Sequence, residues 1–426
     1  DPATYDMICA AQTVGVFQIE SRAQMSMLPR LKPRCFYDLV IEVAIVRPGP
    51  IQGGMVHPYL RRRQGLEPVE YPSPAVREAL SRTLGVPIFQ EQVMQLAILA
   101  AGFSAGEADQ LRRSMAAWRR KGGLGQFYDR IVNGMLARGY PREFADRVFR
   151  QIQGFGEYGF PESHAASFAL LVYVSCWMKH HHPDAFLAAL LNAQPLGFYS
   201  PSQLIQDAKR NGVRVLAVDV QFSGVETHLE PHGVRLGFNR VAGLSEQAMH
   251  DIVLHRPYTS VEDLALRAGL DRGDLNALAA AGALRSIAGH RHQAVWATSG
   301  QHRRPVLLIT APIHEPLPEL SAPTEGDDIV ADYASLGLTL GRHPLAVLRP
   351  TLTQLGTQPA EVLNRYTHGR LARAAGLVTH RQRPSTARGT LFISLEDETG
   401  MINVIIQPEV LERFYKAVLY SQLMLV

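Results

Sequence analysis

Cysteine is scarce in this sequence, with Cys9, Cys35 and Cys176 as its three occurrences among 426 residues. They lie far apart, and no two of them share the Cys-x-x-Cys spacing. Their number and spacing argue against a disulfide framework and against a thiolate metal site. We therefore expect a protein of a reducing, cytoplasmic compartment.

Long apolar runs are missing as well. The longest, from Ala165 to Trp177, is interrupted by Ser167 and Ser175 and is shorter than the roughly 20 residues that a membrane span needs. No signal peptide opens the chain. The run is interpreted as a buried core helix, and no contact with a membrane is expected.

The sequence also lacks a strand with paired aspartates. Enzymes that transfer nucleotidyl groups hold divalent metal ions with two or three converging carboxylates, but no strand-borne Asp-x-Asp is found. The acidic stretch EDETG at 396–400 lies where a hairpin turn is expected. The histidines at 180–182 point in different directions on a helix and are interpreted as a solvated helix end before Pro183. No catalytic or metal-binding centre is predicted in this chain.

The sequence does have enough apolar material for several cores. Hydrophobic residues make up 46% and charged residues 19% of a length that favours two to four domains. Long helical segments punctuated by Gly and Pro extend to about residue 225, so the predicted fold is multidomain and mainly α. The formal net charge of +4 permits nucleic-acid binding without requiring it, and the placement of arginine must decide.

A basic helix is predicted after residue 102, where Ser104 and Glu107 have the spacing of a capping box. Its basic residues are Arg112, Arg113, Arg119, Arg120 and Lys121. Guanidinium groups bind phosphate oxygens bidentately, so this basic stripe suits a triphosphate or a nucleic-acid backbone. A solvated helix face is the alternative, although the acidic residues nearby, Glu107 and Asp109, are both assigned to the first turn, where the helix dipole favours them.

The stretch GFGEYGFPESHAASFALL at 154–171 combines glycines and aromatic residues before another predicted helix. Glycine lets the backbone adopt unusual angles or lie close to a ligand. One interpretation is a helix start capped by Ser163, with His164 as a packed core histidine. The other is a bare helix start, kept open by Ala165 and Ala166, against which a flat ring or a sugar lies.

Residues 240–287 contain two short helical units with Gly-containing turns, VAGLSEQAMHDIVLHR and LDRGDLNALAAAGALRSI. A hairpin of this kind aims backbone amides at a phosphate. Gly243 and Gly282 are therefore predicted to contact DNA in a clamp that does not depend on base sequence. A purely structural role for these turns is the alternative.

Five prolines between residues 305 and 323 mark an inter-domain linker. From about residue 370 the hydrophobic period changes to two. GLVTH, TLFISLEDETG and MINVIIQ predict three strands, PEVLERFYKAV predicts a helix and VLYSQLMLV predicts a last strand. This order predicts a small OB-like barrel whose final strand lies beyond residue 426. Both chain ends look cut, so an internal piece of a longer protein is expected.

Several motifs, in a fixed order, resemble the bacterial C-family DNA polymerases, the class of the polymerase III alpha subunit. They are TVGVFQIESR, AIVRPGPIQGGMV, IFQEQVMQLA, DQLRRSM, YGFPESHAASFAL and KHHHPDAFLAALLN. The resemblance continues through the tandem hairpins and into RQRPSTARGTLFISLEDETGMINVI. It covers nearly the whole chain.

The resemblance implies five regions. They are the end of an α+β palm at 1–50, fingers at 51–225, tandem helix-hairpin-helix motifs at 226–300, a linker region at 301–369 and an incomplete OB-fold at 370–426. It also implies that the catalytic aspartates, which bind Mg²⁺ in the complete protein, lie upstream of residue 1.

The same resemblance assigns roles to four residues and implies a set of partners. Arg112 and Arg113 would hold the triphosphate of the incoming nucleotide, and Ser163 and His164 would face its sugar. The implied partners are primer–template DNA, deoxynucleoside triphosphates, a sliding clamp and mutagenesis accessory proteins.

Two features resemble the error-prone, damage-induced branch of the family. Glu162 stands where replicative members usually carry Lys before the Ser-His pair, and the segment 192–213 is similar to that branch. A cation near the nascent base pair would stabilise a correctly placed nucleotide electrostatically. Removing it weakens this stabilisation, which predicts looser discrimination between correct and incorrect nucleotides, and translesion synthesis. Two alternatives stay open: the replicative polymerase III alpha subunit, and a non-catalytic nucleic-acid-binding protein with hairpin and OB modules.

Overall fold

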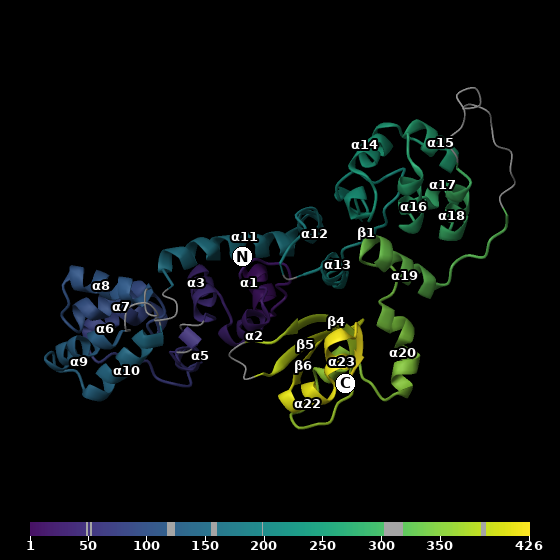
Figure 1. The fold of residues 1–426 in the computed structure, drawn as a ribbon. Coiled ribbons are helices and arrows are strands. Elements are labelled where there is room, and N and C mark those ends of the chain that lie inside the picture. The colour runs from purple at the N-terminus through teal and green to yellow at the C-terminus, as the bar shows by residue number, and fades with distance from the viewer. Residues whose placement is uncertain are drawn as a thin grey trace. The chain divides into compact units, whose positions relative to one another are not determined.

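The structure is a computed structural model. It describes residues 1–47, 50–51, 53–116, 124–154, 160–197, 199–301, 318–384 and 389–426. Clustering of spatial contacts divides the chain into two compact units, Asp1–Val213 and Arg214–Val426 (Figure 1). Its described helices do not include one that is long and apolar enough to cross a membrane.

The regular elements described in the first unit are all helices. They are α1 (Pro2–Cys9), α2 (Arg22–Leu31), α3 (Phe36–Ile45), α5 (Val56–Arg63), α6 (Pro74–Leu80), η1 (Ser81–Thr83), α7 (Gln90–Leu99), α8 (Ala105–Ala116), η2 (Leu124–Phe127), α9 (Tyr128–Leu136), α10 (Arg142–Gly154), α11 (Glu162–His181), α12 (Pro183–Asn192) and α13 (Pro201–Arg210). The described part of 1–50, predicted as the end of an α+β palm, therefore contains helices and no strand, and the palm remnant is not confirmed.

The core of this unit forms where α11 packs along α3, with α1 and α12 also against α11. Every residue of α3 from Asp38 to Ile45 is buried, which explains the apolar character of this helix on all sides. The predicted core helix at 165–177 does form, as part of α11, but only one face of it is buried. Leu170, Leu171 and Val174 are about half exposed, which corrects the expectation of full burial.

Unit two begins with a three-stranded sheet of order β1-β3-β2, followed by short helices and a second sheet. Its elements are β1 (Val215–Leu216), β2 (His228–Glu230), β3 (Gly233–Arg235), η3 (Phe238–Arg240), α14 (Glu246–Leu254), α15 (Val261–Arg267), α16 (Arg272–Ala280), α17 (Arg285–Ala288), α18 (Arg291–Ser299), α19 (Glu325–Leu336), α20 (Pro344–Gln354), α21 (Ala360–Leu363), β4 (Ala375–Gln382), β5 (Leu391–Glu396), β6 (Met401–Ile406), α22 (Pro408–Arg413), α23 (Tyr415–Tyr420) and β7 (Leu423–Leu425). The predicted linker region at 301–369 thus contains three helices, α19, α20 and α21.

The second sheet is antiparallel, with strand order β6-β5-β4-β7 and a bulge in β4 between Val378 and His380. The predicted order of three strands, a helical segment and a strand is confirmed. The last strand is shorter than predicted, because α23 continues to Tyr420 and β7 begins only at Leu423. The sheet is consistent with an OB-like topology, but an OB-fold is not confirmed.

The turn between β5 and β6 is built around Asp397, as the EDETG sequence predicts. Its Oδ1 accepts hydrogen bonds from the amides of Thr399 and Gly400 at 2.8 and 2.9 Å, and its Oδ2 accepts one from the amide of Ala360 at 2.8 Å. Turn chemistry therefore accounts for this acidic residue.

Candidate nucleotide and nucleic-acid interfaces

The basic helix α8 begins with the predicted capping box. The Ser104 amide donates to Glu107 Oε2 at 2.7 Å, and the Glu107 amide donates to Ser104 Oγ at 3.3 Å. This reciprocal pair fixes the first turn, and Arg112 and Arg113 follow about two turns later. The predicted basic residues at 119–121 lie outside the described residues.

Arg112 and Arg113 share one carboxylate. Asp109 lies 2.9 Å from Arg112 Nη2 and 2.7 Å from Arg113 Nη2. The Arg112 hydrogen bond, followed by that of Arg113, lowers the pKa of Asp109 below its usual value. Asp109 is thus in the second turn as a partner of both arginines, and not in the first turn as predicted. The two side chains remain 39% and 75% exposed, so they can still reach a phosphate.

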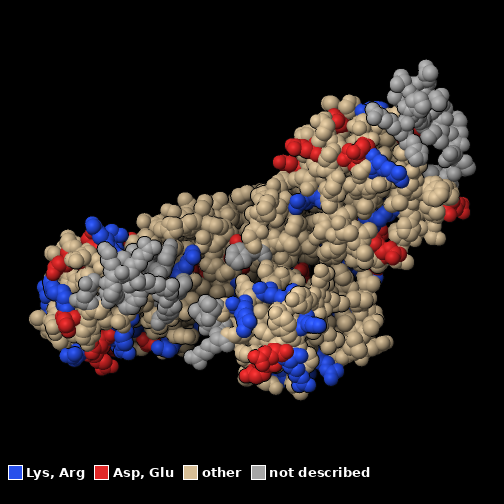
Figure 2. Space-filling model, in the orientation of Figure 1, with Lys and Arg blue, Asp and Glu red and all other residues tan. Residues whose placement is uncertain are grey.

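The surface around α8, α9 and α10 carries basic and acidic side chains side by side (Figure 2). Glu107 pairs with Arg130 at 3.2 Å, and Asp146 pairs with Arg142 at 3.7 Å. Among the described residues, Arg112 and Arg113 of the predicted basic stripe and their basic neighbours Arg130 and Arg142 thus each pair with a carboxylate. Such exposed pairs are weak, and a phosphate can compete for them.

The start of α11 differs from the first of the two sequence interpretations, the helix capped by Ser163. The N-cap is Pro161, which offers no side-chain acceptor, and Ser163 is the second helical residue. Ser163 and His164 are both exposed, so neither the predicted Ser163 cap nor the packed core histidine forms. His164 instead contacts two aromatic rings edge to face, Phe160 at 5.1 Å and Phe168 at 4.4 Å between centroids. The bare helix start is the interpretation that agrees with this geometry.

Glu162 is not a free negative charge beside this helix start. Its Oε1 accepts a hydrogen bond from Tyr37 Oη at 2.6 Å and lies 3.3 Å from Arg82 Nη1. Sequence reasoning missed both partners, because they are 125 and 80 residues away along the chain and no local pattern indicates them.

The two predicted parts of the nucleotide site belong to the same unit, but no described contact joins them. Helix α7 contacts both parts. It packs against α8, and the amide of Gln90 at its start donates to Phe160 O, just before α11, at 3.3 Å. The Gly-rich residues 155–159, which were expected to approach the ligand, lie outside the described residues.

Gly243 occupies an exposed turn just before α14. Its φ of +81° is in the left-handed region, and a Cβ atom added there would meet nothing within 4 Å. Ser245 caps the following helix by accepting a hydrogen bond from the Ala248 amide at 3.2 Å. The space beside this glycine is therefore open.

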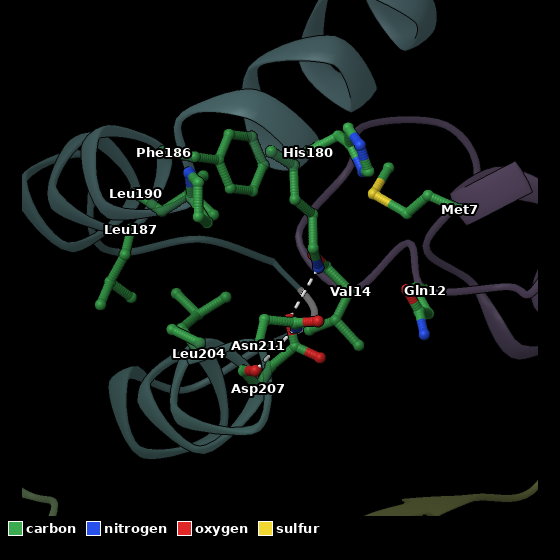
Figure 3. Close-up of a pocket in the computed structure, with 13 residues that line it drawn as sticks. Met7, Gln12, Val14, His180, Phe186, Leu187, Leu190, Leu204, Asp207 and Asn211 are labelled. Atoms are coloured by element: carbon green, nitrogen blue, oxygen red, sulfur yellow. Dashed lines mark hydrogen bonds and ion pairs between the residues drawn. The ribbon is translucent and has the colours of Figure 1, made fainter. Parts of the chain in front are cut away.

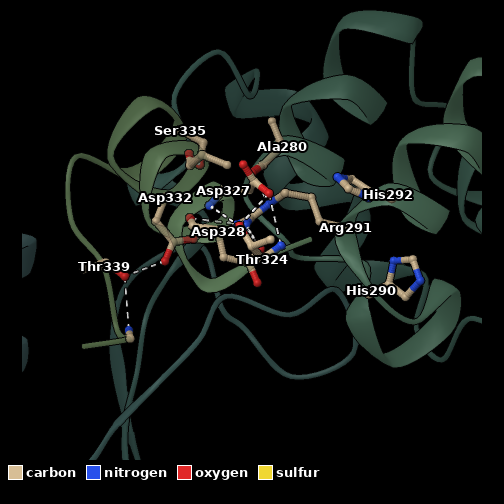
Figure 4. A network of polar contacts seen from close by, with 12 residues as sticks. Ala280, His290, Arg291, His292, Thr324, Asp327, Asp328, Asp332, Ser335 and Thr339 are labelled. Carbon is tan, nitrogen blue, oxygen red and sulfur yellow. Dashed lines mark hydrogen bonds and ion pairs between the residues drawn. The ribbon is translucent and has the colours of Figure 1, made fainter. Parts of the chain in front are cut away.

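Gly282 is in a different environment. A Cβ atom added there would lie 3.3 Å from Nη2 of Arg291, which fills the space behind the turn. Arg291 donates to Ala280 O at 2.9 Å and forms ion pairs with Asp328 and, at 2.6 Å, with Asp332 (Figure 4). Only 11% of its side chain is exposed. This arginine holds α16, α18 and α19 together and is neutralised, so it is not an additional cation for DNA.

A cavity of about 260 Å³ opens elsewhere in the first unit, between the end of α11 and helices α12 and α13 (Figure 3). At one wall Lys179 donates to Val14 O at 2.6 Å and pairs with Asp207 at 2.7 Å. Leucine and phenylalanine side chains form much of the rest. None of the residues predicted to bind nucleotide or DNA lines this cavity.

Comparisons with known proteins agree with these features. The family described as the bacterial DNA polymerase III alpha subunit finger domain matches residues 1–139, and the helix-hairpin-helix motif family matches residues 212–294. The first match includes the region predicted as palm, and the second includes both hairpin glycines.

The whole chain also aligns with curated bacterial proteins named error-prone DNA polymerase. The identity is 62% to the protein of Bordetella bronchiseptica, 59% to that of Burkholderia pseudomallei and 58% to that of Alkalilimnicola ehrlichii. The alignments cover 100% of this chain and 41–42% of each relative, so the chain spans about two fifths of their length. Residues 1–139 therefore match the finger domain of the bacterial DNA polymerase III alpha subunit, and the chain is similar throughout to error-prone DNA polymerases.

Proposed function

We propose that the full-length protein is an error-prone DNA-directed DNA polymerase, and that this chain supplies its fingers and DNA-binding modules. The observation that carries the proposal is the alignment of the whole chain, at 62% identity, with a relative of that name. The finger-domain and helix-hairpin-helix matches support the same division of labour within the chain.

In this proposal Arg112 and Arg113 bind the triphosphate of the incoming deoxynucleoside triphosphate. Asp109 holds both guanidinium groups in place before the nucleotide arrives, and the phosphate oxygens then replace it as their acceptor. Ser163 and His164 contact the sugar from the exposed start of α11. A flat ring or sugar would lie beside the partly exposed Ala166, which adds little bulk there, whereas Ala165 faces the core.

The tandem hairpins bind the primer–template backbone. Gly243 presents an open turn to a phosphate, and the N-terminal amides of α14 lie directly after it. The turn at Gly282 is backed by Arg291 and contributes through its backbone shape. Neither turn offers a side chain for base readout, so we propose binding that does not depend on base sequence.

The part of the chain that the structure describes does not offer a set of side chains that fits a Mg²⁺ centre. Among the described residues, no group of three or more His, Cys, Asp or Glu side chains could hold a metal ion. We assign no step of nucleotidyl transfer to a metal here. We propose that the Mg²⁺-binding aspartates belong to the part of the full-length protein that this chain does not include.

We further propose that the protein works in the bacterial cytoplasm in damage-induced mutagenesis and translesion synthesis. A sliding clamp and mutagenesis accessory proteins would bring it to DNA. These roles rest on the resemblance to the error-prone branch of the family and not on a described contact.

Primer extension by the full-length protein with Mg²⁺ tests the proposal, with one correct or one incorrect nucleotide offered at a time. Ready extension with both supports an error-prone polymerase. Extension with the correct nucleotide alone points to the replicative alternative. DNA binding without extension points to the non-catalytic alternative.

A further inference from the structure

The first residue of α11, Glu162, is held by side chains from three other elements. Its carboxylate accepts the Tyr37 hydroxyl of α3 at 2.6 Å and pairs with Arg82 of η1 at 3.3 Å. Its backbone amide donates to Glu91 Oε2 of α7 at 3.0 Å. The start of α11 is therefore tied to α3, η1 and α7 at one residue.

The amide contact compensates for a missing cap. The first amides of a helix have no partner within the helix, and Pro161 at the N-cap offers no side-chain acceptor. The Glu91 carboxylate takes that place from a helix 71 residues away. A charged acceptor at a helix N-terminus is also favoured by the helix dipole.

The hydroxyl contact is well suited to hold the carboxylate. Burial, and then the hydrogen bond to Glu162, raise the pKa of Tyr37 above its ordinary value, so the phenol stays a neutral donor. The Arg82 guanidinium also lies over the Tyr37 ring, 5.9 Å from its centroid. The Arg82 side chain is 72% exposed, whereas Tyr37 is partly buried, so Tyr37 is the better-protected partner of the two.

The residues that follow this anchor are the exposed ones. Ser163 and His164 extend from the same helical turn, and His164 is flanked by Phe160 and Phe168. Because that turn begins at Glu162, the anchor sets where these two side chains stand relative to α3 and α7.

We propose that Tyr37 and Glu91 are positioning residues that act through Glu162 to hold Ser163 and His164 toward the incoming nucleotide. The role of these residues in nucleotide binding rests on the proposed function, whereas their contacts with Glu162 do not. It also gives the negative charge of Glu162 a structural use, in place of the expected effect of an unpaired charge beside the substrate.

Hydrogen exchange and kinetics of the full-length protein test the proposal together. Tyr37→Phe removes the hydroxyl that holds Glu162, and exchange of the peptide 160–168 should become about tenfold faster or more, the factor expected for one lost hydrogen bond to a charged group. The KM for nucleotide should rise several-fold, with an unchanged Kd for primer–template DNA.

Two further variants sharpen the comparison. Glu162→Gln keeps an acceptor for the Tyr37 hydroxyl and should retain most of the protection, whereas Glu162→Leu should lose it. Tyr71→Phe is a matched control, since Tyr71 is also a partly buried tyrosine of the first unit that contacts a nearby arginine through its ring. It should leave both exchange and KM unchanged.

Unchanged exchange in Tyr37→Phe would overturn the anchor. Faster exchange with an unchanged KM would overturn the positioning role. A wild-type protein that does not extend primers would overturn the proposed function and the positioning role with it, while exchange would still decide whether Tyr37 holds the helix start.

Discussion

Glu42 provides a prediction that depends only on the core of the first unit. It lies within α3 with no exposed surface, and neither of its carboxylate oxygens has a hydrogen-bond partner among the described residues. Burial raises its pKa well above the ordinary value of 4.5. The folded chain therefore keeps a proton that the unfolded chain releases as the pH rises above about 4.5.

The sign and size of the effect follow from this difference in bound protons. Between the unfolded and folded pKa values of Glu42, the free energy of unfolding falls by about 1.4 kcal/mol per pH unit. Glu42→Met removes the titration with little change in side-chain length. From pH 5 toward pH 7 the variant should gain stability relative to the wild type with this slope for as long as the pH stays below the folded pKa of Glu42. Its advantage at pH 5 should already be about 1–3 kcal/mol, because an unpaired polar group is no longer buried.

Urea unfolding at pH 5, 6 and 7 measures this difference directly. Subtracting the wild-type curve from that of Glu42→Met cancels the other titrating groups. Glu78→Met replaces an exposed glutamate of α6 and should run parallel to the wild type. If Glu42→Met also runs parallel, the buried carboxyl does not titrate as argued and the reasoning fails.

Asp38, one turn earlier on α3, provides the opposite case. Its carboxylate contacts Arg63 at 2.5 and 2.6 Å and accepts the Arg34 amide at 2.8 Å. Although burial opposes ionisation, these bonds lower the pKa of Asp38 below its ordinary value of 3.8. Its stabilisation is present above that value and is lost as the pH falls through the folded pKa. Asp38→Asn should cost about 3 kcal/mol at pH 7 and less in acid, as the same urea assay measures.

Two further predictions separate nucleotide binding from DNA binding in the full-length protein. Replacing Arg112 and Arg113 by Ala should raise the KM for nucleotide about tenfold or more, the factor for one lost charge-assisted hydrogen bond, and leave the Kd for DNA nearly unchanged. Arg142→Ala, which removes another exposed arginine paired with an aspartate, should change neither. Gly243→Ala should weaken DNA binding in a filter-binding or anisotropy assay, whereas Gly139→Ala, with a φ of +82° and equally open space, controls for backbone strain. Equal effects of both sets on KM and Kd would contradict this division.

Local features could be predicted from the sequence because their partners are close along the chain. The capping box of Ser104 and Glu107 and the Asp397 turn each join residues that are three apart along the chain. The alternation of strand residues after 370 reflects which face of a sheet is buried, and this too is a local signal. The predicted start of the helix at 163 was nearly right, but its cap was wrong, since the acceptor comes from Glu91 in another helix.

Tertiary partners could not be predicted in the same way. The hydrogen bond between Tyr37 and Glu162 joins residues 125 apart, and the cavity wall joins Lys179 to Val14 across 165. These contacts depend on how the helices pack, and the spacing of residues along the sequence does not predict that packing. The helices α19 to α21 were missed for another reason: the prolines before them favoured an irregular segment, but these helices begin after that run, and Thr324 and His343 cap the first two.

Glu162 and the pair Arg112 and Arg113 show that the charges in a sequence do not by themselves predict what those residues do. The sequence supplied a sign for each residue, but the structure supplies a partner that changes what the charge can do. For Glu162 the partner is a partly buried tyrosine, and displacing it would leave a polar group unpaired at a cost in free energy. For Arg112 and Arg113 the partner is an exposed aspartate, and exposed pairs of this kind contribute only about 0–1 kcal/mol. A triphosphate that offers bidentate contacts can therefore replace Asp109 as the partner of the two arginines, which suits them to bind a nucleotide. The hydrogen bond between Glu162 and Tyr37 is harder to break, which suits Glu162 to hold the start of α11 in position.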